Sequence, residues 1–151
     1  MRRRWYALVV CALFVFGSTA YVSPAHAITG AACNLPVVVA RLGFGPGTIP
    51  RGGSSTARLS GRNCTRHPRT VNIMWTGAFS GNGAANCPVI DPLRQKVTVP
   101  ASSALSVALR FVVPAACRAT RLTASARVTD ARGQLIRTKT AYVRIIQPHS
   151  T

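Results

Sequence analysis

Only a few side chains in this sequence could take part in acid–base chemistry. The 151 residues include three histidines and just two carboxylates, Asp91 and Asp130, with no glutamate. General acid–base catalysis needs a group that titrates near the working pH. Histidine can be such a group, so His67 and His149 are also candidates. We interpret His67, in the run NCTRHPRT, as a loop residue, and Asp130, which precedes ARGQ, as the residue that caps a turn.

Nucleophilic and paired-carboxylate mechanisms lack the residues that they need. No Gly-x-Ser-x-Gly sequence occurs, and the two aspartates are separated by a whole predicted strand, whereas glycosidases need two neighbouring carboxylates. The glycine cluster GFGPG at residues 43–47 is not followed by GK[ST], so we predict a loop. We therefore expect no catalytic residue, cofactor or metal, and a protein that is not an enzyme; an uncharacterised enzyme is an alternative.

The cysteines indicate disulfides rather than a metal site. Cys11 lies in the apolar N-terminal run, which leaves an even number, Cys33, Cys64, Cys87 and Cys117. Paired zinc ligands usually lie two to four residues apart, and these four are far more widely spaced. An even number of cysteines in a small exported domain predicts two disulfides. Asn63-Cys64-Thr65 also fits the N-glycosylation sequon.

The first 27 residues have the features of a secretory signal peptide. Residues 2–4 are arginines, residues 5–16 are apolar, and Ala25-His26-Ala27 fits the small-x-small pattern before a cleavage site. The apolar run is short for a membrane span, and an uncleaved membrane anchor is the alternative. We predict a secreted or extracytoplasmic protein, at the cell surface or in the periplasm, with one domain at residues 28–151 and no membrane span in it.

The charge of the chain is strongly one-sided. Nineteen lysines and arginines against two carboxylates give a formal net charge of +17 at pH 7. Such an excess favours contact with polyanions and says little about the fold. GC-rich coding is a simple explanation for the preference for arginine over lysine, but it does not account for the scarcity of acids.

Short runs of alternating apolar and polar residues, separated by Gly, Pro, Asn and Ser, indicate an antiparallel all-β domain. The clearest run is 69–77, where Val71, Ile73 and Trp75 share one face and predict a core position for the tryptophan. In the last run, a bulge near residues 138–140 is expected to keep Arg137 and Lys139 out of the core. The seven predicted strands are 35–44, 56–63, 69–77, 93–100, 105–113, 121–129 and 135–146.

The order and spacing of these runs resemble an immunoglobulin-like antiparallel β-sandwich of about seven strands. The C-terminal half, VTVP, LSVALRFVVPAAC, RLTASARVTDARGQLIRT and AYVRI, is similar to the small secreted immunoglobulin-like proteins of bacteria. The chain differs from antibody domains because its cysteines do not fall on the second and sixth strands and no Tyr-x-Cys occurs on the sixth. The resemblance implies a fold only, since this fold hosts many activities.

The topology implied by this resemblance predicts how the cysteines pair. Cys33 precedes the first strand and Cys64 ends the second, so both lie at one end of the sandwich. Cys87 follows the third strand and Cys117 lies between the fifth and sixth, which places both at the other end. Because bonded cysteines need Cα atoms within about 7 Å, we predict Cys33–Cys64 and Cys87–Cys117.

Outward-facing basic residues on the predicted strands are candidates for polyanion binding. We predict that five of them share one sheet: Arg58, Arg62, Arg94, Lys96 and Arg110. If 93–100 and 105–113 form a hairpin in which Val99 pairs with Leu105, Arg94 lies opposite Arg110. Like charges directly opposite each other are destabilising, and either solvent and salt screen them or a bound polyanion relieves them.

These observations lead to one functional expectation and its alternative. We expect a secreted, non-enzymatic, disulfide-stabilised β-sandwich that binds an anionic cell-envelope polymer or a protein partner. The domain has few aromatic residues, whereas single-stranded nucleic acid is usually bound on several exposed rings, so no specific nucleic-acid signal is present. A small-molecule carrier of the same fold is the alternative.

Overall fold

The computed structural model describes residues 32–146, which form two sheets and a single turn of 3-10 helix. The predicted signal peptide, residues 1–27, and His149 lie outside the described residues. No helix within 32–146 is long and apolar enough to cross a membrane. The elements are β1 (Val37–Gly45), β2 (Thr48–Pro50), β3 (Ser54–Asn63), β4 (Arg69–Ser80), η1 (Ala84–Asn86), β5 (Ile90–Val99), β6 (Ala104–Val112), β7 (Arg121–Asp130) and β8 (Leu135–Ile146).

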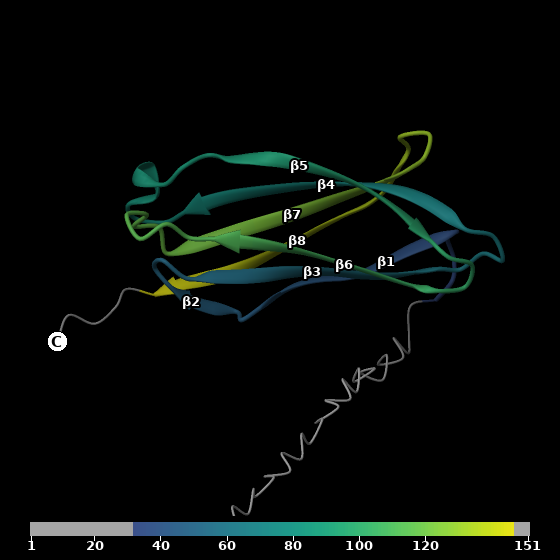
Figure 1. Ribbon diagram of the computed structural model, residues 1–151, viewed down its shortest axis with the longest axis horizontal. Coiled ribbons are helices and arrows are strands. Elements are labelled where there is room, and N and C mark those ends of the chain that lie inside the picture. The colour runs from purple at the N-terminus through teal and green to yellow at the C-terminus, as the bar shows by residue number, and fades with distance from the viewer. Residues whose placement is uncertain (1–31, 147–151) are drawn as a thin grey trace, which may run out of the picture.

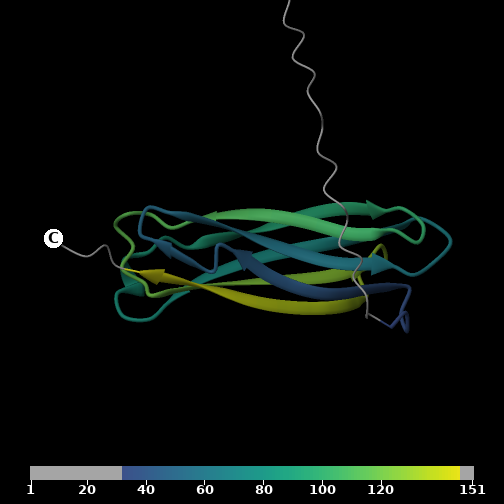
Figure 2. The ribbon, with the colours of Figure 1, turned by 90° about the horizontal axis from the view of Figure 1, so that it is seen from below.

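The strands are divided between a three-stranded sheet, β1-β3-β6, and a five-stranded sheet, β2-β8-β7-β4-β5. All pairings are antiparallel except that of β2 with β8. The two sheets are elongated layers that lie one over the other (Figures 1 and 2). The all-β prediction is confirmed, with β2 as an additional strand: it comes just after the glycine cluster, whose first three residues belong to β1 rather than to a loop.

The core lies between the sheets and follows the alternation of the sequence. Val71, Ile73 and Trp75 of β4 are buried, and so are the alternate residues Leu122, Ala124, Ala126 and Val128 of β7. Trp75 is 1% exposed, which confirms its predicted core position. Its Nε1 donates a hydrogen bond to Oε1 of Gln95 at 3.3 Å, as a buried indole requires.

The predicted hairpin between β5 and β6 is wrong. β5 pairs with β4 in the five-stranded sheet, and β6 pairs with β3 in the three-stranded sheet. The chain therefore crosses between the layers around Ser102, which has a positive φ of 52°. Val99 and Leu105 are both buried because they face the same core from opposite sheets. Two neighbouring strands of one sheet would show the same alternation of buried and exposed residues, so the sequence pattern does not distinguish the two arrangements. Arg94 consequently does not lie opposite Arg110.

The bulge in β8 exists, but it is not at residues 138–140. The register shifts between Val128 and Thr129, whose partners are Arg137 and Leu135, so Ile136 is the extra residue. Arg137 and Lys139 therefore keep the parity of the buried Val143. Arg137 is nevertheless exposed and Lys139 half-buried, because the three-stranded sheet is narrower and leaves part of the inner side of β8 uncovered.

Both predicted disulfides are present. Cys33–Cys64 joins the segment before β1 to the residue after β3, with a Cα–Cα distance of 5.7 Å. Cys87–Cys117 joins the residue after η1 to the connection between β6 and β7, with a Cα–Cα distance of 4.5 Å. The first bond lies where β1 begins and β3 ends, and the second lies beyond the ends of β4 and β6, so the bonds are at opposite ends of the strands. Two disulfides point to an oxidising, extracytoplasmic environment.

Candidate anion-binding surface

The titratable residues considered for catalysis are not brought together. His67 is exposed in the β3–β4 loop, and Asp91 is exposed on β5. Asp130 caps the β7–β8 turn as predicted, because its Oδ1 accepts hydrogen bonds from the backbone N–H groups of Arg132 at 2.9 Å and Gln134 at 2.8 Å. Within residues 32–146, no three His, Cys, Asp or Glu residues are grouped in a way that could hold a metal ion.

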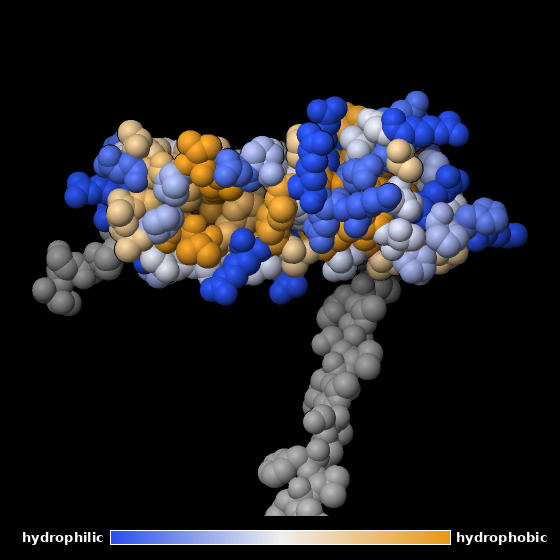
Figure 3. Space-filling view, turned by 45° about the horizontal axis from the view of Figure 1, so that its top comes forward, coloured by the Kyte–Doolittle hydropathy of each residue, from blue (hydrophilic) through white to orange (hydrophobic). Residues whose placement is uncertain are grey.

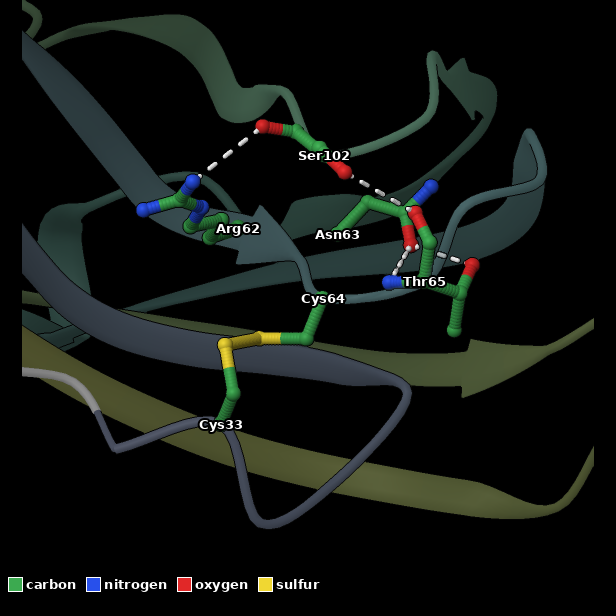
Figure 4. The surroundings of a disulfide bond; sticks show 6 residues. All are labelled: Cys33, Arg62, Asn63, Cys64, Thr65 and Ser102. Atoms are coloured by element: carbon green, nitrogen blue, oxygen red, sulfur yellow. Dashed lines mark hydrogen bonds between the residues drawn. A yellow bond between two sulfur atoms is a disulfide. The ribbon is translucent and has the colours of Figure 1, made fainter.

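Asn63, in the sequon, is the last residue of β3 and precedes Cys64 of the first disulfide (Figure 4). It is completely buried. Its Nδ2 lies 2.8 Å from the His67 carbonyl oxygen, 3.1 Å from that of Val99 and 2.9 Å from that of Pro100. Its Oδ1 accepts hydrogen bonds from the backbone N–H and the hydroxyl of Thr65. The amide is therefore fully used inside the protein and is not accessible to a glycosyl donor.

The five basic residues predicted to share one sheet are split between the two outer faces. Arg58 and Arg62 on β3 and Arg110 on β6 project from the three-stranded sheet, whereas Arg94 and Lys96 are on β5 of the five-stranded sheet. The prediction of one shared sheet is wrong because it depended on the β5–β6 hairpin. These five residues therefore do not form one surface.

The outer face of the three-stranded sheet also carries Arg41. Several residues beside its arginines have small side chains or none. A hollow of about 310 Å³ there is lined by Arg41, Arg58 and residues such as Gly43, Gly45 and Ser106. Two of the guanidinium groups have partners in the protein. Nε of Arg110 donates to Oγ of Ser54 at 3.0 Å, and Nη2 of Arg62 lies 3.5 Å from the carbonyl oxygen of Ser102.

The outer face of the five-stranded sheet carries a larger basic hollow, of about 530 Å³. Arg94 and Arg127 are both register partners of Met74, from β5 and β7 on its two sides. Lys96 and Asn72, a neighbouring pair in the same register, also line the hollow. Since adjacent strands lie about 4.8 Å apart, the Cα atoms of the two arginines are about 10 Å apart. Three cations therefore surround a concave surface whose floor contains Met74.

A second basic group lies at the other end of the same face. Arg121 of β7 is the direct register partner of Arg144 of β8, so two like charges are opposite each other across the ladder. Such a pair costs some tenths of a kcal/mol. The guanidinium of Arg121 lies over the ring of Tyr142, 4.8 Å from its centroid, and a hollow of about 410 Å³ is lined by these three residues and Thr120.

The positive charge of these groups is not neutralised within the protein. Across residues 32–146 no arginine or lysine forms an ion pair with a carboxylate. The nearest carboxylate in the β7–β8 hairpin, Asp130, is occupied by the turn. In Figure 3, blue, hydrophilic side chains are most numerous over the right-hand part of the surface, with orange, apolar patches between them and over the left-hand part.

Three functional candidates, Arg121, Arg127 and Arg144, were not among the five basic residues predicted to bind a polyanion. The signal that could have found them is the strict alternation of β7, which leaves Arg121 and Arg127 on one face of one strand. Arg127 meets Arg94 and Lys96, and Arg121 meets Arg144, only because of the order of the strands in the sheet, which the alternation within one strand does not predict.

The fold is that of a two-sheet, all-β domain. The similarity of this chain to known proteins is a similarity of fold. No family model matches the chain, and no curated protein is similar to it in sequence. Among solved structures, it is similar to Pseudomonas fluorescens alkylpurine DNA glycosylase AlkC bound to DNA containing an abasic site analog. The TM-score is 0.52 and the identity 10%, over 78% of this chain and 32% of the glycosylase.

Two further solved structures are similar over most of this chain. One is a Paenibacillus sp. cycloisomaltooligosaccharide glucanotransferase, with a TM-score of 0.49 and 16% identity over 71% of this chain and 14% of the enzyme. The other is the CARDB domain of a Pyrococcus furiosus protein in complex with di-metal ions, with a TM-score of 0.47 and 7% identity over 73% of this chain and 96% of that domain. This chain thus corresponds to about a third or less of the enzymes that it matches.

These comparisons overturn the expectation that the chain is not an enzyme. The solved structure matched at a TM-score of 0.52 is part of an enzyme, the DNA glycosylase. The small number of acids and histidines was used to exclude enzymes as a class, and that exclusion does not stand. Identities of 16% or less show the fold alone and assign no reaction.

Proposed function

We propose that this chain is an exported, immunoglobulin-like β-sandwich that binds an anionic polymer of the cell surface. The assignment of the fold is supported by strand order. In immunoglobulin-like domains the first, second and fifth major strands share one sheet and the third, sixth and seventh share the other. With β2 counted as an addition, β1, β3 and β6 correspond to the first set and β4, β7 and β8 to the second.

Export is supported by two independent features of the chain. The first 27 residues have the n-region, apolar run and small-x-small site of a signal peptide. Two disulfides close the ends of the domain, and such bonds persist in oxidising compartments. Both features are expected of a protein that works at or outside the cell surface.

The observation that carries the proposal is the unneutralised charge. The sequence contains nineteen basic residues, three of them in the predicted signal peptide, and only two carboxylates. The described part of the chain, residues 32–146, forms no ion pair. A ligand with many negative groups would remove repulsion such as that between Arg121 and Arg144. The 530 Å³ hollow is lined by Arg94, Lys96 and Arg127, which favours an anion over the apolar compounds that carrier sites usually hold.

The proposal is tested by retention of the oxidised protein on isolated cell envelopes at graded ionic strength. Binding through unpaired cations is expected to be strong at about 50 mM salt and lost by about 500 mM, since salt competes with polyanion contacts. Retention that does not change with salt would contradict the proposal. It would instead favour a protein partner, for which the exposed apolar residues Val89, Leu93 and Val112 are the candidates.

A further inference from the structure

The two basic groups on the five-stranded sheet lie in line along one strand. Arg127 belongs to the group around Met74, which we call subsite 1 (Arg94, Lys96 and Arg127), and Arg121 to subsite 2 (Arg121, Tyr142 and Arg144). Both arginines are on the outer face of β7, six residues apart. At about 3.3 Å per residue, their Cα atoms are about 20 Å apart.

The cations of the two subsites are free to bind a ligand. Arg94, Lys96, Arg121, Arg127 and Arg144 are all exposed. Among the described residues, none of these five side chains donates a hydrogen bond to the protein. On the three-stranded sheet, by contrast, the guanidinium groups of Arg62 and Arg110 already have protein partners. The stacking of Arg121 on Tyr142 also fixes its guanidinium above the face.

The surface between the subsites is rich in hydroxyl groups. Ser125 and Thr140 are register partners whose side chains hydrogen-bond each other at 3.0 Å, and Thr123 is the partner of Tyr142. The outward-facing residues of β7 and β8 here carry no charge, and the exposed Asp91 lies two strands away from β7 on β5. A ligand that crosses this area along β7 therefore needs anionic groups at its two ends and polar, hydroxyl-bearing units between them. Tyr142 is the only aromatic residue among the large exposed side chains of residues 32–146, whereas single-stranded nucleic acids need several rings.

We propose that the outer face of the five-stranded sheet binds a linear anionic glycan lengthwise along β7, with one oxyanion group in subsite 1 and another in subsite 2. The oxyanion is a phosphate or a carboxylate, since arginine recognises both. This inference rests on the proposed function and adds to it the face, the two subsites and the class of polymer. The three-stranded sheet lies outside the site.

The inference is tested with the oxidised protein and three double variants of equal charge. Arg94→Gln with Arg127→Gln removes both arginines of subsite 1, and Arg121→Gln with Arg144→Gln removes both arginines of subsite 2. Arg58→Gln with Arg62→Gln is the control on the opposite face. Each is titrated at about 100 mM salt with uronate oligomers and with sugar-phosphate oligomers, in lengths shorter and longer than the 20 Å span. Circular dichroism confirms that every variant is folded.

A ligand that reaches both subsites gains affinity because its second contact is intramolecular. For the unmodified protein, we expect the longer oligomers of one series to bind about tenfold more tightly than the shorter ones. Whether the uronate series or the phosphate series shows this advantage identifies the oxyanion as a carboxylate or a phosphate. Either subsite variant should lose this tenfold advantage, while the control should keep it within about twofold.

The possible failures are distinguishable. If the control loses as much affinity as the subsite variants, binding to polyanions stands, but the assignment to one face and two subsites is overturned. If single-stranded DNA of matching length shows the advantage and both glycan series do not, the polymer class is overturned. If no polyanion binds to the unmodified protein even at low salt, the proposed function fails together with the inference.

Discussion

Replacing Asn63 with alanine should be one of the most destabilising single changes outside the apolar core. The side chain is completely buried and links the β3–β4 loop to the end of β5. Its Nδ2 contacts the carbonyl oxygens of His67, Val99 and Pro100, and its Oδ1 accepts two hydrogen bonds from Thr65. Alanine removes all of these contacts at once.

The magnitude follows from the groups left behind. A net hydrogen bond contributes about 1 kcal/mol, and a buried polar group without a partner costs about 1–3 kcal/mol. The Nδ2 bond to Val99 is fully buried, and those to His67 and Pro100 are partly buried. We therefore expect a loss of about 3–5 kcal/mol in the free energy of unfolding. For a domain of this size, that corresponds to a fall in Tm of about 15 °C.

Asn72→Ala is the matched control, because Asn72 makes a single hydrogen bond, from Nδ2 to the carbonyl oxygen of Asp130 at 3.1 Å. It should cost about 1 kcal/mol. Both variants are compared with the unmodified, oxidised protein by urea unfolding and by thermal unfolding followed by circular dichroism. If Asn63→Ala costs no more than Asn72→Ala, the inferred role of Asn63 in joining the loop to β5 is incorrect.

Three further changes test the packing, the charges and the second disulfide. Gly61→Ala should cost about 2–3 kcal/mol, because its Cβ would collide with the Val38 carbonyl oxygen. Gly43→Ala, whose nearest atom is in the flexible Arg41 side chain at 3.5 Å, should be tolerated in the same urea unfolding assay. Arg144→Gln should raise stability by some tenths of a kcal/mol at low salt, with no gain at 1 M salt; an equal gain for Arg127→Gln, which faces Thr138 and Met74, would argue against repulsion across the β7–β8 ladder. Replacing Cys87 and Cys117 together by serine should lower the free energy of unfolding by about 2–4 kcal/mol, and a midpoint in urea unchanged from that of the unmodified protein would contradict this.

The sequence predicted the parts of the fold that depend on local alternation. β4 and β7 have an inner row of apolar residues and an outer row of polar ones, so their buried faces were predictable. The pairing of the cysteines was also predictable, because it depends only on which end of the domain each loop occupies. Asp130 was identified as a turn residue because an aspartate before a short glycine-containing run commonly accepts the turn amides.

The assignment of strands to sheets could not be predicted in the same way. Val99 and Leu105 face the core whether β5 and β6 form a hairpin or lie in different layers, so their burial carries no information on pairing. The candidate site depends on that pairing. Arg94 is separated from Arg127 by more than thirty residues of sequence but only by β4 in space. The bulge was placed at residues 138–140 to keep Arg137 and Lys139 out of the core, whereas it lies at Ile136. The three-stranded sheet leaves part of the inner side of β8 uncovered, so these two residues need no bulge to avoid burial.

The central claim, that unpaired cations hold an anionic polymer, is tested most directly by the salt dependence of the binding constant. The oxidised protein is titrated with one polyanion between about 50 and 500 mM salt, and the logarithm of the binding constant is plotted against that of the salt concentration. If the two oxyanion groups held in the subsites each lose a condensed counterion from the polymer, the slope should be about −1.5. A slope near zero, with binding retained throughout, would contradict the account.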